Sequence, residues 1–145
     1  MKPPYQYNDG GRTAQGYKGH TGDCVTRSVA IATGSDYTNV YEIINKLAQS
    51  ERRGTRKRGV SSARTGVYKN TIKKLMNHVG AEWTPLMGIG TGCKVHLCED
   101  ELPKKGRYVL SVSKHLCAWI DGVLHDTHDC SREGKRCVYG YWKLG

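Results

Sequence analysis

The chain has 145 residues, 37% of them hydrophobic, and this length holds one domain with one modest core. It contains no run of the ~20 apolar residues that cross a bilayer and no apolar segment of a secretory signal at its start, so we expect a protein that stays in the cytoplasm. Lys and Arg number 23 against 13 Asp and Glu, and the net charge of +10 makes a polyanion a first candidate partner.

The chain begins with an irregular lead that is followed by a helix. Residues 1–22 are rich in Tyr, Gly and turn signals, and we expect little regular structure there. A helix is predicted over 24–33, because Asp23 is a typical helix-capping residue and Gly34 is a typical helix end.

Two more helices are predicted on either side of a charged loop. Apolar residues at three- and four-residue spacing indicate a second helix that begins after Ser35 or Asp36, and a third helix over 67–79. Residues 51–66 mix charged side chains with Gly, Ser and Thr, which predicts an exposed loop. Nine basic residues and one acid fall within 51–74, so most of the net positive charge of the chain lies in this segment.

After Gly80 the pattern changes to short β-rich segments separated by turn residues. The pair Asp121-Gly122 between two of these segments is a strong hairpin signal. The predicted strands are 82–86, 107–113, 115–120, 123–126 and 136–142. We therefore expect one α+β domain over 1–145, with N-terminal helices packed on a small C-terminal antiparallel sheet.

Six cysteines in a chain without a secretory signal are expected as thiols, metal ligands or a nucleophile rather than as disulfides. Cys117 lies in an apolar run and predicts a small buried side chain. Cys24 differs, because it opens the first predicted helix. A helix amino terminus and a nearby histidine both lower the pKa of a thiol towards the nucleophilic thiolate, so Cys24 is a candidate nucleophile if a histidine reaches it.

His115 is the candidate partner of Cys24. It begins a predicted strand, and the hairpin that follows returns the chain beside it, so that Asp126 comes near the position opposite His115. A carboxylate there would hold the tautomer and orientation of the imidazole, which completes a Cys-His-Asp relay. His125 alternates to the other face of its strand and is expected to point away from His115.

This order of residues resembles the papain-like cysteine peptidase superfamily, in which a helix-borne Cys comes early, a His begins a sheet strand, and an Asp or Asn lies on the next strand. The segments 22–27 and 114–127 also look like a group of small, uncharacterised tailed-bacteriophage proteins, and the resemblance spans nearly the whole chain. It implies a papain-like fold with Cys24 as nucleophile, His115 as general base and Asp126 as the orienting acid.

The resemblance further implies a cysteine hydrolase that acts on a peptide, isopeptide or related amide bond of a host or phage protein in the bacterial cytoplasm, with no cofactor. Papain-like enzymes usually place an oxyanion-stabilising Gln about six residues before the Cys, and Lys18 stands there in this chain. The backbone N–H of Cys24 supplies one oxyanion donor, and Gln15, Lys18 and His20 are the candidates for the second.

A non-enzymatic binding protein is the main alternative. Clustered cations can contact phosphates without reading bases, or can steer an acidic host protein, and no base-reading motif accompanies the cluster. The basic residues proposed for this contact are Arg52, Arg53, Arg56, Lys57 and Arg58.

A zinc-stabilised module is a third interpretation, since two clusters supply enough ligands for a tetrahedral site. Neither cluster has the paired two-residue spacing of a zinc ribbon or finger, so we expect no metal. The clusters are Cys93, His96 and Cys98, and His125, His128 and Cys130, with Cys137 further on.

Overall fold

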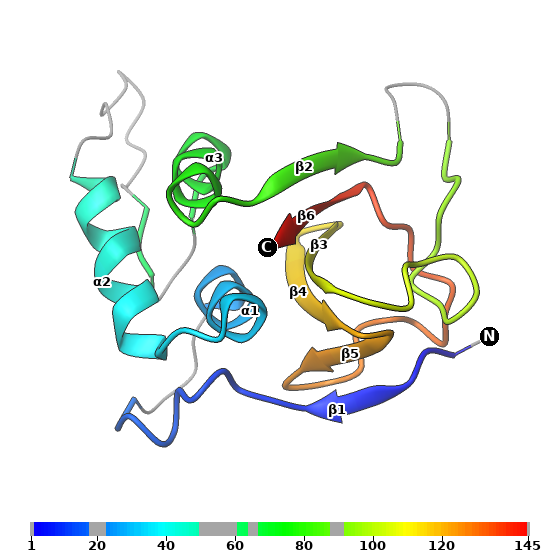
Figure 1. The fold of residues 1–145 in the computed structure, drawn as a ribbon, viewed down its shortest axis with the longest axis horizontal. Coiled ribbons are helices and arrows are strands. Elements are labelled where there is room, and N and C mark those ends of the chain that lie inside the picture. Colours follow the sequence, from blue (N-terminus) through cyan, green and yellow to red (C-terminus); the bar gives the residue numbers. More distant parts are fainter. Residues whose placement is uncertain (1, 18–22, 50–60, 64–66, 88–91, 145) are drawn as a thin grey trace.

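The computed structural model describes residues 2–17, 23–49, 61–63, 67–87 and 92–144, and everything below concerns these residues (Figure 1). They form an α+β fold in which helices dominate the first half and strands the second. The helices are α1 (Cys24–Thr33), α2 (Tyr37–Ala48) and α3 (Lys69–His78). The strands are β1 (Tyr5–Tyr7), β2 (Glu82–Pro85), β3 (Arg107–Val112), β4 (His115–Ile120), β5 (Val123–Asp126) and β6 (Gly140–Leu144).

Helix α1 has the predicted bounds and lies between α2 and the sheet (Figure 1). It ends where Gly34 adopts a left-handed conformation, with φ of 70°, which glycine reaches without steric cost. Asp23 occupies the position before the helix, but its side chain makes no capping hydrogen bond. The predicted capping by Asp23 is therefore wrong, and the carboxylate is used in the ion-pair cluster described below.

The six strands form one mixed sheet in the order β1-β5-β4-β3-β6-β2. Strand β1 pairs with β5 in parallel, and the other neighbouring strands pair antiparallel. The expectation of a fully antiparallel sheet and an irregular lead is thus wrong for residues 5–7. Strand β1 has three residues, which is too short for an alternating pattern to reveal a strand in the sequence.

The last strand begins later than predicted. It starts at Gly140, and before it Cys137 makes an isolated bridge with His96. A side chain at Gly140 would collide with the ring of Trp83 on the neighbouring strand β2, so glycine permits this close approach.

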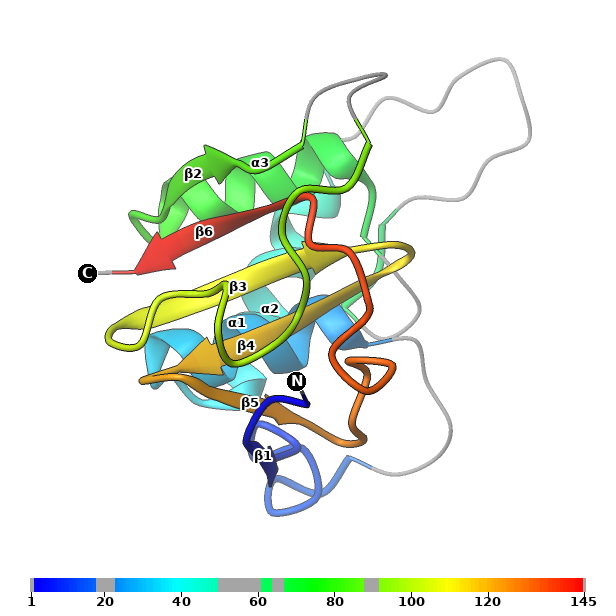
Figure 2. The same ribbon diagram turned by 90° about the vertical axis from the view of Figure 1, so that its right-hand side faces the viewer.

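Both faces of the sheet are covered. The helices pack on one face, and the segments that follow β2 and β5 lie over the other (Figures 1 and 2). Val29, Ile44 and Leu75 belong to the helix-side core, and Leu97 and Trp119 belong to the loop-side core. The five residues have no exposed surface, so the central strands are held from both sides.

Cys93 and Cys137 form a disulfide that joins the two loop segments over the second face. The prediction that the cysteines are thiols is wrong for this pair. The reason is long-range, since the bridge between His96 and Cys137 brings the two segments side by side. The other four cysteines, Cys24, Cys98, Cys117 and Cys130, are free thiols.

Among the described residues, no helix combines the length and the apolar character that would let it cross a membrane.

Candidate active site

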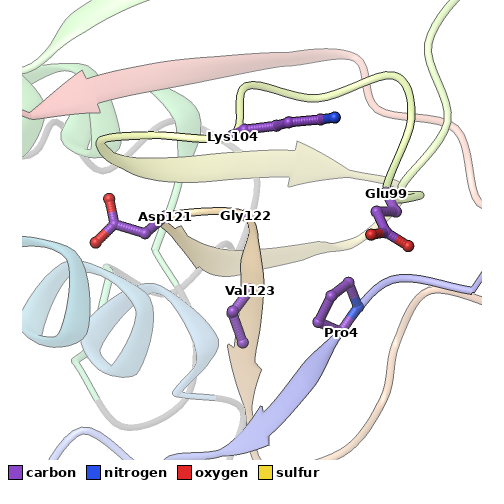
Figure 3. Close-up of a pocket in the computed structure, with 6 residues that line it drawn as sticks. All are labelled: Pro4, Glu99, Lys104, Asp121, Gly122 and Val123. Atoms are coloured by element: carbon purple, nitrogen blue, oxygen red, sulfur yellow. The ribbon is translucent and has the colours of Figure 1, made fainter.

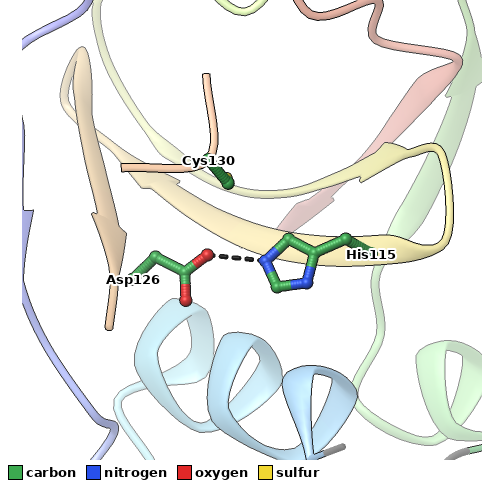
Figure 4. A group of neighbouring side chains, drawn as sticks. All are labelled: His115, Asp126 and Cys130. Carbon is green, nitrogen blue, oxygen red and sulfur yellow. Dashed lines mark hydrogen bonds and ion pairs between the residues drawn. The ribbon is translucent and has the colours of Figure 1, made fainter. Parts of the chain in front are cut away.

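The hairpin of β4 and β5 brings two of the predicted site residues together. Its turn residues Asp121 and Gly122 have positive φ values of 48° and 81°, the combination that a tight two-residue hairpin turn requires. The resulting register pairs Ala118 with His125. His115 at the beginning of β4 and Asp126 at the end of β5 therefore lie at the same end of the hairpin (Figure 4).

His115 and Asp126 form a short hydrogen bond inside the fold. The distance from His115 Nε2 to Asp126 Oδ2 is 2.6 Å, and the two side chains are 13% and 3% exposed. The other carboxylate oxygen, Oδ1, accepts the backbone N–H of Thr127 at 2.7 Å and lies 3.4 Å from a guanidinium nitrogen of Arg27. Because both oxygens are engaged, the carboxylate is fixed in the orientation that holds the imidazole.

Cys24 reaches the same imidazole from the helix side. It is the first residue of α1, which packs against β4, the strand that begins with His115. Burial raises the pKa of this thiol, but the hydrogen bonds from His115 and from the Leu116 backbone N–H, with the charges of His115 and Arg27, lower the pKa below its ordinary value. Cys24 is thus biased towards thiolate.

The imidazole of His115 is biased towards its protonated form. Burial lowers its pKa, but hydrogen bonds to Asp126, Cys130 and Cys24 and the charge of Asp126 raise the pKa to about 11. The pKa of Asp126 is lowered, because the hydrogen bond from His115 and the charges of His115 and Arg27 outweigh the effect of burial. The arrangement therefore places an imidazolium between a carboxylate and a thiol.

Arg27 and Asp23 belong to the site, although the sequence did not single them out for this role. Arg27 lies one turn after Cys24 on α1 and pairs with both Asp126 on β5 and Asp23. The side chain of Asp23 is fully buried, pairs with Arg12 at 3.3 Å and accepts the hydroxyl of Tyr37 at 2.6 Å. The i,i+4 spacing of Asp23 and Arg27 predicts their pairing, but nothing local predicts the contact with Asp126.

Cys130 is a further thiol beside the imidazole (Figure 4). It lies in the loop after β5, hydrogen-bonds to Cys117 and His115, and is 3% exposed. The hydrogen bond from Cys117, together with the hydrogen bond and charge of His115, outweighs burial and lowers the pKa of Cys130, while the pKa of Cys117 is raised. A ring nitrogen of His115, a carboxylate oxygen of Asp126 and the sulfur of Cys130 all lie within 4.8 Å of one another.

The two zinc clusters suggested by sequence spacing are not assembled as groups. Cys93 of the first cluster is bound in the disulfide with Cys137. In the second, His125 faces Asn8, with 3.3 Å between its Nδ1 and the amide nitrogen, and points away from His115 as predicted. His128 lies against His115 with ring centroids 5.6 Å apart. Only Cys130 of that cluster is within ligand distance of the His115 and Asp126 donors.

Of the three candidates for the second oxyanion donor, Gln15 alone is among the described residues. Gln15 accepts the Thr38 backbone N–H through Oε1 at 2.6 Å, which ties its side chain to the first turn of α2. Lys18 and His20 lie outside the described residues. The basic tract, Arg52, Arg53, Arg56, Lys57 and Arg58, also lies outside them.

A surface hollow of about 220 Å³ lies away from this site (Figure 3). Its lining includes the turn and first residue of β5, whereas Asp126 is the last residue of that strand. The lining residues are Pro4, Glu99, Lys104, Asp121, Gly122 and Val123. The hollow therefore adds no residue to the cluster around His115.

The chain matches no protein family model, no curated protein and no solved structure.

Proposed function

We propose that this protein is a cysteine hydrolase with a papain-like fold that cleaves peptide, isopeptide or related amide bonds. The observation that carries the proposal is the buried pair of His115 and Asp126, joined at 2.6 Å, on strands that pack against α1, the helix whose first residue is Cys24. A nucleophile held at a helix amino terminus, a base within hydrogen-bond reach and an acid that orients the base are the parts that covalent acyl transfer needs.

In the acylation step, the Cys24 sulfur attacks the carbonyl carbon of the substrate and the carbonyl electron pair moves to oxygen. The tetrahedral intermediate collapses, the C–N bond breaks, and the amine leaves with the proton that His115 carried. The acyl group is then held on Cys24 as a thioester. The backbone N–H of Cys24 is the proposed donor to the oxyanion.

In the deacylation step, His115 accepts a proton from water as the water oxygen attacks the thioester carbon. The C–S bond breaks, the acid product leaves, and Cys24 returns as thiolate beside protonated His115. The two steps together consume one amide and one water and release one amine and one acid. Asp126 keeps its negative charge throughout and stabilises the imidazolium.

The proposed setting is the cytoplasm of a bacterial host, with a host or phage protein as substrate, as the resemblance to tailed-bacteriophage proteins implies. The role left for the basic tract is to attract an acidic substrate or partner to the enzyme. A binding protein without enzymatic activity would instead use the tract for nucleic acid or an acidic host protein, and would not need Cys24.

Thiol labelling tests the proposal directly. The full chain is treated with limiting iodoacetamide at neutral pH, and modified cysteines are mapped by mass spectrometry. We expect Cys24 to react before Cys98, Cys117 and Cys130, and His115→Ala to remove this preference because the thiolate loses its partner.

The control is Cys98→Ser, which removes a free thiol that contacts Glu101 and not His115. This variant should leave the rate at Cys24 unchanged. The hydrolase would be contradicted if iodoacetamide modified Cys24 no faster than it modifies the cysteines of the unfolded chain. The binding protein would be supported if, in addition, charge reversal at Arg56 and Lys57 abolished partner binding.

A further inference from the structure

The site has a second chemical capacity that acyl transfer does not use. Cys130 takes no part in the proposed reaction, yet its sulfur joins a ring nitrogen of His115 and a carboxylate oxygen of Asp126 within 4.8 Å. The three residues come from β4, from β5 and from the loop after β5, and the fold brings them together in a poorly exposed position (Figure 4).

We propose that His115, Asp126 and Cys130 bind one Zn²⁺ ion, and that the bound ion switches off the hydrolase. The inhibitory part of this inference rests on the proposed function, whereas the binding part does not. Imidazole nitrogen, carboxylate oxygen and thiolate sulfur are the three donor types that zinc takes in proteins. Three protein ligands leave a fourth tetrahedral position for a water molecule.

The distances allow such a site after small shifts. Zinc bonds of about 2.0–2.3 Å place tetrahedral ligand atoms roughly 3–4 Å apart, so donors within 4.8 Å need only small movements inward. The hydrogen bond of 2.6 Å between His115 and Asp126 must open to admit the ion. Cys117 hydrogen-bonds to Cys130, and such a neighbour orients and supports a ligand thiolate.

Zinc at this position blocks catalysis for a reason of proton balance. If the ion takes the ring nitrogen that faces Asp126, the proton on that nitrogen is released. The neutral imidazole then carries its one remaining proton on the nitrogen that serves Cys24. To protonate the leaving amine in the acylation step, His115 would then have to become an imidazolate anion. It is therefore a much weaker acid than the imidazolium, and acylation is blocked.

The experiment uses the full chain, freed of metal by a chelator and then titrated with Zn²⁺. Bound zinc is measured by equilibrium dialysis, and the rate of iodoacetamide modification at Cys24 is measured in the same samples. We expect one zinc per chain and at least about a tenfold slower reaction at Cys24 when the site is filled, because the imidazolium that favours the Cys24 thiolate is lost.

Two variants separate the metal site from the hydrolase. Cys130→Ser should weaken zinc binding by at least about tenfold, and added zinc should no longer slow the reaction at Cys24 in this variant. Cys24→Ser should remove that reaction and bind zinc as the original chain does. Cys98→Ser is the matched control, and zinc binding should not change in it.

Cobalt gives a measurement that shows whether a thiolate binds the metal. Co²⁺ bound through a thiolate has a sulfur-to-metal charge-transfer absorption, which we expect in the original chain and in Cys24→Ser but not in Cys130→Ser.

Absence of this absorption from the original chain, or equal zinc affinity in Cys130→Ser, would overturn the metal site. If Cys24 proves unreactive while Cys130-dependent zinc binding persists, the hydrolase fails and the inhibitory claim fails with it, but the metal site stands.

Discussion

The charged side chains at the two ends of the β4–β5 hairpin differ in burial. At the open end, His115, Asp126 and Arg27 are packed between sheet and helix, and the side chain of Asp126 is 3% exposed. At the turn end, Asp121 and Lys104 line a shallow hollow and are exposed (Figure 3). Burying charges costs free energy, and the open end offsets this cost with ion pairs and hydrogen bonds that fix a thiol, an imidazole and a carboxylate in one geometry.

Removing the nucleophile should produce the largest difference between the two ends of the hairpin. Cys24→Ser should reduce hydrolysis of a cleavable amide substrate by at least about 10³-fold, because a serine hydroxyl in this site is not held as an anion. Lys104→Ala at the turn end should leave the rate unchanged. Steady-state assays on both variants give the comparison, and equal losses would contradict a functional difference between the two ends.

Breaking the clamp between helix and sheet should mainly affect stability. Arg27→Gln leaves the buried carboxylates of Asp23 and Asp126 short of a positive partner, so the free energy of unfolding should fall by about 3–5 kcal/mol. Urea unfolding at neutral pH measures the change. A loss below about 1 kcal/mol would indicate that Arg27 does not hold α1 to β5.

Acid should weaken the open end through Asp126. The pKa of this group is lowered in the folded state, so its contribution to stability is present above the ordinary value of 3.8 and is lost as pH falls through the folded-state value. We expect Asp126→Asn to lower the free energy of unfolding by about 2 kcal/mol at pH 7. This difference should shrink as the pH is lowered below 3.8, and urea unfolding at several pH values tests it.

The smallest test is a shift in a pH profile. The rate of iodoacetamide modification at Cys24 should rise with a midpoint below the ordinary thiol pKa of 9.0. In His115→Gln the midpoint should move upwards, because burial remains while the imidazolium is lost. A profile identical in both proteins would show that His115 does not tune Cys24.

Local patterns in the sequence determined the elements that carry the relay. The bounds of α1, β4 and β5 were predicted correctly, since Gly34 ends the helix and the turn pair Asp121-Gly122 separates the two strands. These signals act through the backbone preferences of a few neighbouring residues, so they can be read without knowledge of the fold. The same patterns placed Cys24 at a helix start.

Tertiary structure alone decided what surrounds those elements. No local signal predicts that β1 joins the sheet beside β5, because the strand has three residues and its partner lies more than a hundred positions away. The Asp23 side chain does not cap α1, because Arg27, Arg12 and Tyr37 contact its carboxylate. The position of Cys130 beside His115 depends on how the loop after β5 packs on the sheet. This packing is set by contacts between residues far apart in the sequence, which no local pattern reports.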